Sequence, residues 1–369
     1  MKVYHLLAGN LRHLTPQIIK TLVVTEHTIS KDSSIEHFYC VKMYGRKMLY
    51  DNVEQNPYHA VFESLHCKNY QLYYSHKDLV HFLRTVSSKD KIIIHGLPNA
   101  KEFAYASISL LLFNPKLLKR CTALCWGSDY RVKPTNLIKI LFNQYMKRIL
   151  CRFKYVLAIS TEDEVEIKKY IPMANVVYTP YMTEEKRQLV DKTPREDSKT
   201  VVMVSHSGWP HNYHMHSFNL LKKYRGRIKV VCPLCYGNAA YIQTVVEEGE
   251  QLFGNDFSYF TELKTPEEYQ EFLRTTDIYV TSAEIQTGLG AISLSMISGS
   301  KVFAKGNVYT SLTGDHFHIF NTETIVDLDY DDFVRPLTRE QAIENIEIFN
   351  KLHFDGCEII EAWRKVYEY

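Results

Sequence analysis

The sequence predicts an α/β protein with two similar halves, each built from a parallel sheet covered by helices. Strand-like apolar runs alternate with helical patterns, as expected for βαβ units. The alternation stops at the polar stretch 184–199 and then restarts, and 369 residues exceed what one compact core usually holds. We therefore expect a first domain over residues 1–183, a linker over 184–199, a second domain over 200–340 and closing helices over 341–369.

The first half consists of short apolar strands separated by helical patterns. We expect strands at 3–8, 37–43, 71–74, 92–95, 122–126, 155–159 and 176–178, with helices at 16–25, 77–86 and 101–111. The first strand is not followed by the GxGxxG fingerprint, which weighs against a dinucleotide-binding oxidoreductase.

The second half repeats this pattern after the polar stretch. We expect strands at 201–205, 228–232, 257–260, 278–282 and 302–304, with helices at 213–224, 239–253 and 266–274. The last residues carry apolar side chains at helical spacing, which predicts the closing helices.

The composition narrows the functional classes. A formal net charge of +2 gives no overall field that would attract nucleic acid. The longest apolar segment, 104–113, is about half the length of a membrane span, and the N-terminal apolar run is too short for a signal peptide. Apolar strands or helices contain Cys40, Cys121, Cys125 and Cys151, which favours buried, reduced thiols in a cytoplasmic protein, soluble or peripheral.

The stretch 283–302 organises the second half. It reads as a loop with Gly288 and Gly290, a short apolar helix, a stop at Gly299 and a strand. A helix N-terminus exposes unpaired N–H groups and the positive end of the dipole, and glycines there let an anion approach closely. We expect a diphosphate at this turn. The alternative is an ordinary tight turn, because a bare GxG is a weak signal.

Other loops after expected strands supply further candidates for a bound sugar nucleotide. Ser207 and the Gly208 amide could face phosphate or sugar, with Asn212 and His214 just beyond. Glu284, in the loop before the glycine turn, could accept hydrogen bonds from sugar hydroxyls, with Gln286 beside it. The alternative for Glu284 is a solvated surface charge.

The segment 233–238 also follows a strand and precedes a helix. Because open α/β sheets bind ligands beyond the carboxyl ends of their strands, Tyr236, Gly237 and Asn238 are candidates for nucleotide or sugar contact. A plain turn in which Asn238 caps the helix is the alternative.

Two groups of residues could instead bind a metal ion. Cys232 and Cys235 have the CxxC spacing of half a zinc site or of a redox pair, but no second CxxC accompanies them. Histidines crowd one loop of the second half but lack a carboxylate partner or the HExxH spacing; they are His206, His211, His214 and His216. We expect one or two of these histidines to make polar contacts to a bound sugar-nucleotide donor, and we expect no metal ion or other cofactor.

Two strand ends of the first half offer a general base for a hydroxyl that attacks an anomeric carbon. His95 ends one strand, and Asp129 follows the next within the segment 126–130. Asp129 is slightly preferred. A satisfied buried histidine and a helix cap are the respective alternatives.

A basic stretch over residues 116–154 is interleaved with apolar side chains and contains Asp129 as its lone acid. A basic helix with an apolar face can lie on an anionic membrane surface, and this bias stands out in a nearly neutral chain. A core helix with a solvated basic side is the alternative.

Taken in order, these motifs resemble the 4-acetamido-4,6-dideoxy-D-galactose (Fuc4NAc) transferases, glycosyltransferase family 56. The matching segments are His95-Gly96, 126–130, Ser207-Gly208 followed by Asn212 and His214, 231–238 with Tyr241 and Ile242, and Gln286 with Gly288 and Gly290. The histidine-rich loop and the many tyrosines of the first half depart from the enterobacterial member. Ser295 stands where a ribose-binding glutamate is common in the broader GT-B donor pattern.

The resemblance implies a GT-B enzyme: two Rossmann-like domains facing across a cleft, with the C-terminal helix returning to the first. It further implies a dTDP- or UDP-sugar donor, a polyprenyl-diphosphate-linked acceptor such as lipid II of a bacterial surface polysaccharide, no metal, and the cytoplasmic face of the membrane. The first domain would bind the acceptor and the second the nucleotide sugar. A sugar-nucleotide epimerase of the same architecture and a non-catalytic sugar-nucleotide-binding protein are the alternatives.

Overall fold

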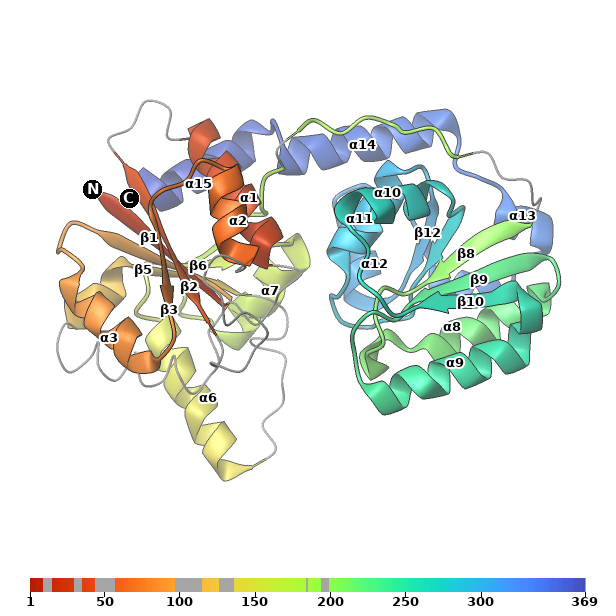
Figure 1. Ribbon diagram of the computed structural model, residues 1–369, viewed down its shortest axis with the longest axis horizontal. Coiled ribbons are helices and arrows are strands. Elements are labelled where there is room, and N and C mark those ends of the chain that lie inside the picture. Colours follow the sequence, from red (N-terminus) through yellow and green to blue (C-terminus); the bar gives the residue numbers. More distant parts are fainter. Residues whose placement is uncertain are drawn as a thin grey trace. The chain divides into compact units, whose positions relative to one another are not determined.

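The computed structural model describes residues 1–8, 15–29, 35–43, 57–96, 115–125, 136–183, 185–193 and 199–368 (Figure 1). The chain divides into two compact units, one formed by Met1–Lys186 with Lys351–Tyr369 and the other by Arg187–Asn350. Each unit is an α/β layer structure around one parallel sheet, as the alternation of strands and helices predicts.

The first unit contains a seven-stranded parallel sheet in the order β3-β2-β1-β4-β5-β6-β7. Its strands are β1 (Lys2–Ala8), β2 (Glu36–Lys42), β3 (Tyr70–Tyr73), β4 (Lys91–His95), β5 (Cys121–Cys125), β6 (Tyr155–Ala158) and β7 (Val176–Tyr178). Its helices are α1 (Thr15–Ile29), α2 (Pro57–Ser64), α3 (His76–Thr85), η2 (Pro115–Arg120), α6 (Leu137–Leu150), α7 (Thr161–Tyr170) and α15 (Cys357–Glu368). The expected helix at 101–111 lies outside the described residues.

Both faces of this sheet are buried, because successive residues of each strand point to opposite sides. One face packs against α3, η2, α6 and α7, and the other against α1, α2 and α15. The fully buried Trp363 of α15 donates its indole N–H to the Pro180 carbonyl at 2.8 Å. The C-terminal helix therefore returns to the first unit, as expected. Cys40, Cys121 and Cys125 are buried, whereas Cys151 is exposed because α6 has ended before it, so its expected burial is wrong.

The second unit contains a six-stranded parallel sheet in the order β10-β9-β8-β11-β12-β13. Its strands are β8 (Thr200–Val204), β9 (Ile228–Pro233), β10 (Phe257–Phe260), β11 (Ile278–Val280), β12 (Lys301–Ala304) and β13 (Phe320–Asn321). Its helices are η3 (Pro210–Asn212), α8 (His214–Leu221), η4 (Lys222–Tyr224), α9 (Ala239–Phe253), η5 (Gly254–Asp256), α10 (Pro266–Arg274), α11 (Leu289–Ile297), α12 (Gly306–Gly314), η6 (Thr322–Val326), α13 (Tyr330–Val334) and α14 (Arg339–His353), which runs on into the first unit.

Helices cover both faces of the second sheet, with α8 and α9 on one side and α10, α11 and α12 on the other (Figure 1). The core beneath α8 and α9 gathers side chains from every central strand, together with Phe218 of α8 and Phe253 of α9. No helix among the described residues has the length and apolarity needed to cross a membrane.

Candidate functional site

The order of strands in the second sheet reverses direction at one point, between β8 and β11. From β8 the chain moves outward to β9 and β10, then returns to the other side of β8 and continues through β11, β12 and β13. The loops after β8 and β11 therefore leave neighbouring strands in opposite directions. Open α/β sheets bind ligands at such a switch point, beyond the carboxyl ends of the strands. The two loops are residues 205–213 and 281–288.

The first loop is held rigidly by its own polar groups. It begins at Ser205 (φ 58°) and ends at Tyr213 (φ 50°), both in the left-handed region that side chains other than glycine rarely adopt. The Asn212 amide donates to the Ser207 carbonyl at 2.6 Å and to the Ser207 hydroxyl at 2.9 Å. Ser207 and Asn212 are fully buried. Both predicted donor contacts thus brace the loop from inside.

Close backbone contact joins this loop to the one that follows β9. The Gly208 N–H donates to the Tyr236 carbonyl at 2.8 Å, and the Asn238 N–H donates to the Gly208 carbonyl at 3.0 Å. A Cβ on Gly237 would lie 2.2 Å from the Gly208 oxygen, so glycine is required there. The Asn238 side chain caps α9 by accepting from the Tyr241 N–H at 2.9 Å. The predicted residues of both loops therefore lie together at one edge of the sheet.

The glycine turn before α11 has the expected form. Gly288 is the N-cap with φ 68°, and the helix runs through nine residues to Ile297. A Cβ on Gly288 would lie 2.3 Å from Nδ1 of His206, so this imidazole lies against the start of the helix. Thr287 Oγ1 lies 3.4 Å from Nε2 of the same ring. The two loops at the switch point thus touch through His206 and Gly288.

Unlike Gly288, Gly290 is at a position where the fold does not require a glycine. It is exposed in the first turn of α11, and a Cβ built there meets no heavy atom within 4 Å. Neither backbone strain nor packing demands a glycine at this position. Its absent side chain leaves the N–H groups of the first helical turn open to an approaching anion.

The loops contain buried polar atoms that lack hydrogen-bond partners. Both amide atoms of Gln286 are in this state, as are Oδ1 of Asn212 and Nε2 of His214. Burial lowers the pKa of His214 to about 3, so its ring is neutral. An unsatisfied buried polar group costs about 1–3 kcal/mol. Such unsatisfied groups are rare in folded proteins and are found at functional sites more often than elsewhere.

A charged network lies at the rim of the same edge. Lys305, directly after β12, lies 2.7 Å from a Glu323 oxygen and 3.5 Å from a Glu284 oxygen. The hydrogen bond from Lys305 lowers the pKa of the Glu323 carboxyl, and the reciprocal interaction raises the pKa of Lys305. The exposed Glu284 is therefore paired with a lysine, and it remains at the loop's outer surface.

The sequence did not single out Lys305 or assign His206 a specific contact. The sequence does contain one signal for Lys305, because this lysine directly follows an expected strand of the second sheet. The four histidines of the crowded loop have separate surroundings. His206 lies against Gly288, His211 stacks on Trp209, and His214 is buried beside Tyr241; the remaining His216 pairs with Glu323. Among the described residues, no three His, Cys, Asp or Glu side chains are arranged to hold a metal ion.

Ser295 and the CxxC pair have structural partners in the second unit. The buried Ser295 hydroxyl donates to the Ala291 carbonyl one turn earlier at 2.8 Å. Cys232 is fully buried, which raises the pKa of its thiol, and the Cys235 thiol lies 3.1 Å from the Glu262 carbonyl.

The first unit places its predicted histidine in a buried chain of rings. His95 Nε2 lies 2.9 Å from His5 Nδ1, and His5 Nε2 lies 2.9 Å from His37 Nδ1. His95 Nδ1 is 3.1 Å from the Tyr181 hydroxyl. Both nitrogens of His95 are thus engaged, and burial lowers its pKa to about 3. Among the described residues, the partner of His95 Nδ1 is the Tyr181 hydroxyl and that of Nε2 is His5. Asp129 and the segment 126–130 lie outside the described residues.

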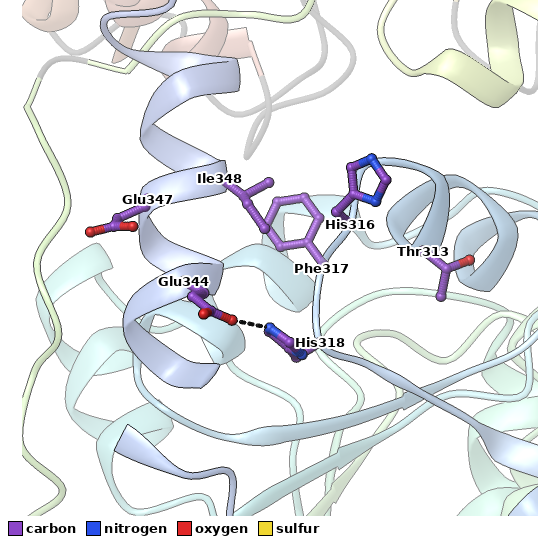
Figure 2. A pocket seen from close by; sticks show the side chains of 7 residues that line it. All are labelled: Thr313, His316, Phe317, His318, Glu344, Glu347 and Ile348. Carbon is purple, nitrogen blue, oxygen red and sulfur yellow. Dashed lines mark hydrogen bonds and ion pairs between the residues drawn. The ribbon is translucent and has the colours of Figure 1, made fainter. Parts of the chain in front are cut away.

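A shallow hollow of about 530 Å³ lies elsewhere on the second unit (Figure 2). Its lining residues are Thr313, His316, Phe317, His318, Glu344, Glu347 and Ile348. They come from the end of α12, the segment before β13, and α14, so the hollow is at the opposite edge of the sheet from the switch-point loops. His318 is paired with Glu344, as Figure 2 shows.

Solved structures of similar fold include glycosyltransferases. Anabaena Alr3699/HepE, in complex with UDP and glucose, matches with a TM-score of 0.65 at 11% identity, covering 100% of this chain and 98% of that one. A Rickettsia africae glycosyltransferase matches at 0.64, with 12% identity and coverage of 100% and 97%. The lipopolysaccharide outer core galactosyltransferase WaaB matches at 0.59, with 13% identity and 99% of each chain covered. The fold is that of a GT-B glycosyltransferase.

The sequence also identifies the family. Residues 2–333 match the model of glycosyl transferase group 56, described as 4-alpha-L-fucosyltransferase, so the chain belongs to this family. The protein is therefore a glycosyltransferase. No curated protein matches the sequence.

Proposed function

We propose that the protein transfers a 4-acetamido-4,6-dideoxyhexose or a related amino sugar from a dTDP- or UDP-linked donor to a polyprenyl-diphosphate-linked glycan. The observation that carries this proposal is the start of α11 at the switch point of the second sheet, where Gly290 leaves the first helical turn open and His206 lies against Gly288. One of the structurally similar proteins, Alr3699/HepE, was solved with UDP and glucose.

The donor diphosphate would lie against the first turn of α11. As the glycosidic bond to the diphosphate breaks, negative charge accumulates on the leaving oxygens. The helix dipole and the unpaired N–H groups of the first turn stabilise that charge without having to reorganise. His206, held against Gly288, would contact the same phosphates, and the unsatisfied amide of Gln286 would bind a neighbouring donor oxygen.

The acceptor hydroxyl needs a base that removes its proton. Asp129 remains the preferred candidate. His95 would take part indirectly, because Tyr181 is the partner of its outer nitrogen and the other nitrogen is bound to His5. Loss of transfer in Asp129→Asn together with normal donor binding would support Asp129, and retained transfer would exclude it.

The lipid-linked acceptor would be met at a membrane surface by residues 116–154. The first turns of α6 expose large apolar side chains, with Ile138 79% exposed; the others are Leu137, Ile140 and Leu141. Lys147 and Arg148 follow in the last turn of the same helix. Apolar side chains beside cations suit the interface of an anionic bilayer. Ile138→Ser with Leu141→Ser should reduce sedimentation with anionic phospholipid vesicles, and unchanged sedimentation would contradict this contact.

Gly290→Ala tests the donor site most cleanly. Alanine favours the helix by up to about 1 kcal/mol, so the protein should be as stable as the wild type or more so. The added methyl should still weaken UDP or dTDP binding by at least about tenfold in calorimetry, because it blocks close approach to the helix.

Gly314→Ala, at the end of α12, is the matched control, since a Cβ there also meets nothing within 4 Å. It should leave nucleotide affinity unchanged. If Gly290→Ala binds the nucleotide as the wild type does, the diphosphate does not lie at α11 and the proposed donor site is wrong.

A further inference from the structure

The loop that follows β8 presents aromatic rings to solvent. Trp209 is 42% exposed and Tyr213 is 46% exposed. The Trp209 ring stacks on that of His211, with centroids 6.3 Å apart and planes 10° apart. Burial lowers the pKa of His211, so an uncharged imidazole supports the indole. Exposed aromatic surface has a free-energy cost in water, and an exposed indole held against a second ring suits a contact with another molecule.

The backbone fixes these rings in place. Pro210 follows Trp209 and starts the short helix η3, which closes with the Asn212 N–H donating to the Trp209 carbonyl at 3.0 Å. Tyr213 then adopts φ 50°, a strained conformation for a bulky residue. Such strain is retained where the surrounding structure enforces it, and it is concentrated at ligand sites. The loop therefore holds its exposed rings on a rigid support.

The exposed indole face suits a sugar ring. A pyranose carries C–H groups on its ring faces and hydroxyl groups at its edges, so one of its faces can stack on an aromatic ring. The polar atoms of the same segment that lack partners, Oδ1 of Asn212 and Nε2 of His214, belong to fully buried residues and are not part of this surface.

We propose that Trp209, backed by His211, stacks against a sugar ring of the acceptor glycan. This inference rests on the proposed function and adds an acceptor subsite to it. The acceptor is favoured over the donor sugar because the rings face solvent, whereas His206, in the same loop, lies against the proposed diphosphate site.

Transfer of labelled sugar to a membrane lipid extract tests the proposal. Initial rates are measured over a dilution series of the extract at saturating donor, and over a donor series at fixed extract. Trp209→Ala should raise the extract concentration needed for half-maximal rate by about tenfold, and Trp209→Phe should restore most of the loss. The donor KM and the affinity for UDP or dTDP should not change.

Tyr259→Ala is the control, because this tyrosine is 44% exposed in the same unit but lies on the edge strand β10, which β9 separates from β8. It should behave as the wild type. Unchanged acceptor dependence in Trp209→Ala, or a rise in the donor KM alone, would overturn the subsite and leave the proposed function standing. Absence of transfer by the wild-type protein would overturn both.

Discussion

The two sheets have the same switch in strand order but use it differently. In the first sheet the strands on either side of the switch, β1 and β4, carry His5 and His95. The buried His5 ring hydrogen-bonds to His95 through one nitrogen and to His37 through the other. In the second sheet the loops beyond the switch carry Gln286 and Asn212 with buried polar atoms that have no partner. One polar cluster is complete without a ligand and the other is not.

The two clusters of buried polar groups therefore differ in whether the protein itself supplies their hydrogen-bond partners. The three neutral rings can all carry their proton on Nδ1 or all carry it on Nε2. In either arrangement one proton lies in every nitrogen–nitrogen contact of the histidine chain. It therefore stabilises the first unit. The loops of the second unit contain buried polar atoms without hydrogen-bond partners, and the proposed sugar nucleotide would supply such partners.

The largest effect is expected when the central histidine of the chain is replaced. His5→Leu removes the hydrogen bonds that His5 makes to His37 Nδ1 and to His95 Nε2 inside the protein, so the free energy of unfolding should fall by about 2–5 kcal/mol. Urea denaturation measures this change. His81→Leu, on the exposed side of α3, is the control and should change stability by less than about 0.5 kcal/mol. A wild-type value for His5→Leu would mean that the chain of rings does not hold the fold.

Gln286→Leu should lower nucleotide affinity without lowering stability, in contrast to the stability loss expected for His5→Leu. It removes two buried amide atoms that have no partner, so the free energy of unfolding should be unchanged or slightly higher. Affinity for UDP or dTDP should fall by about 10- to 100-fold in calorimetry, since a donor oxygen loses its hydrogen bond. A stability loss as large as that of His5→Leu, with normal nucleotide affinity, would show that both clusters are structural.

Acid should destabilise the first unit through the same histidines. Burial lowers the pKa of His37 to about 4 and that of His95 to about 3, below the usual 6.5. The unfolded chain therefore binds protons between these values while the native rings stay neutral. Stability is complete above pH 6.5 and falls as the pH drops toward 4, by up to about 1.4 kcal/mol per pH unit for each ring.

Urea denaturation as a function of pH tests this loss of stability on acidification. The wild type should lose stability steeply between pH 6.5 and 4, and His5→Leu should lose less over the same range. Equal slopes would argue against the buried neutral chain.

The smallest effect concerns Asn238, predicted as a donor contact and found as the cap of α9. Asn238→Ala should lower the free energy of unfolding by about 1 kcal/mol, and Asn238→Ser should restore it. Thr265→Ala, which removes the cap of α10, should cost a similar amount and leave nucleotide affinity intact. If Asn238→Ser is stable but binds UDP weakly, the amide also contacts the donor.

Periodicity predicts much of this architecture. Two parallel sheets, the position of α11 and the glycine stop after it follow from apolar spacing and from Gly288 and Gly299, whose φ values are 68° and 72°. The return of the last helix followed from the resemblance to two-domain transferases. These features depend on local signals or on a common architecture.

Contacts between distant residues could not be predicted in the same way. Nothing in the sequence places His5 beside both His37 and His95, because strand order decides which histidines meet. The contact between His206 and Gly288 likewise depends on β8 lying next to β11. For this reason the sequence could name the candidate loops but could not separate the residues that brace them from those left open to a ligand.

The proposed donor site places a diphosphate against the first turn of α11 in the second unit. A crystal structure of the protein with UDP tests it most directly. We expect phosphate oxygens within about 3 Å of the backbone nitrogens at the start of α11, beside His206. A diphosphate bound away from the switch-point loops, for example in the hollow at the opposite edge, would contradict it.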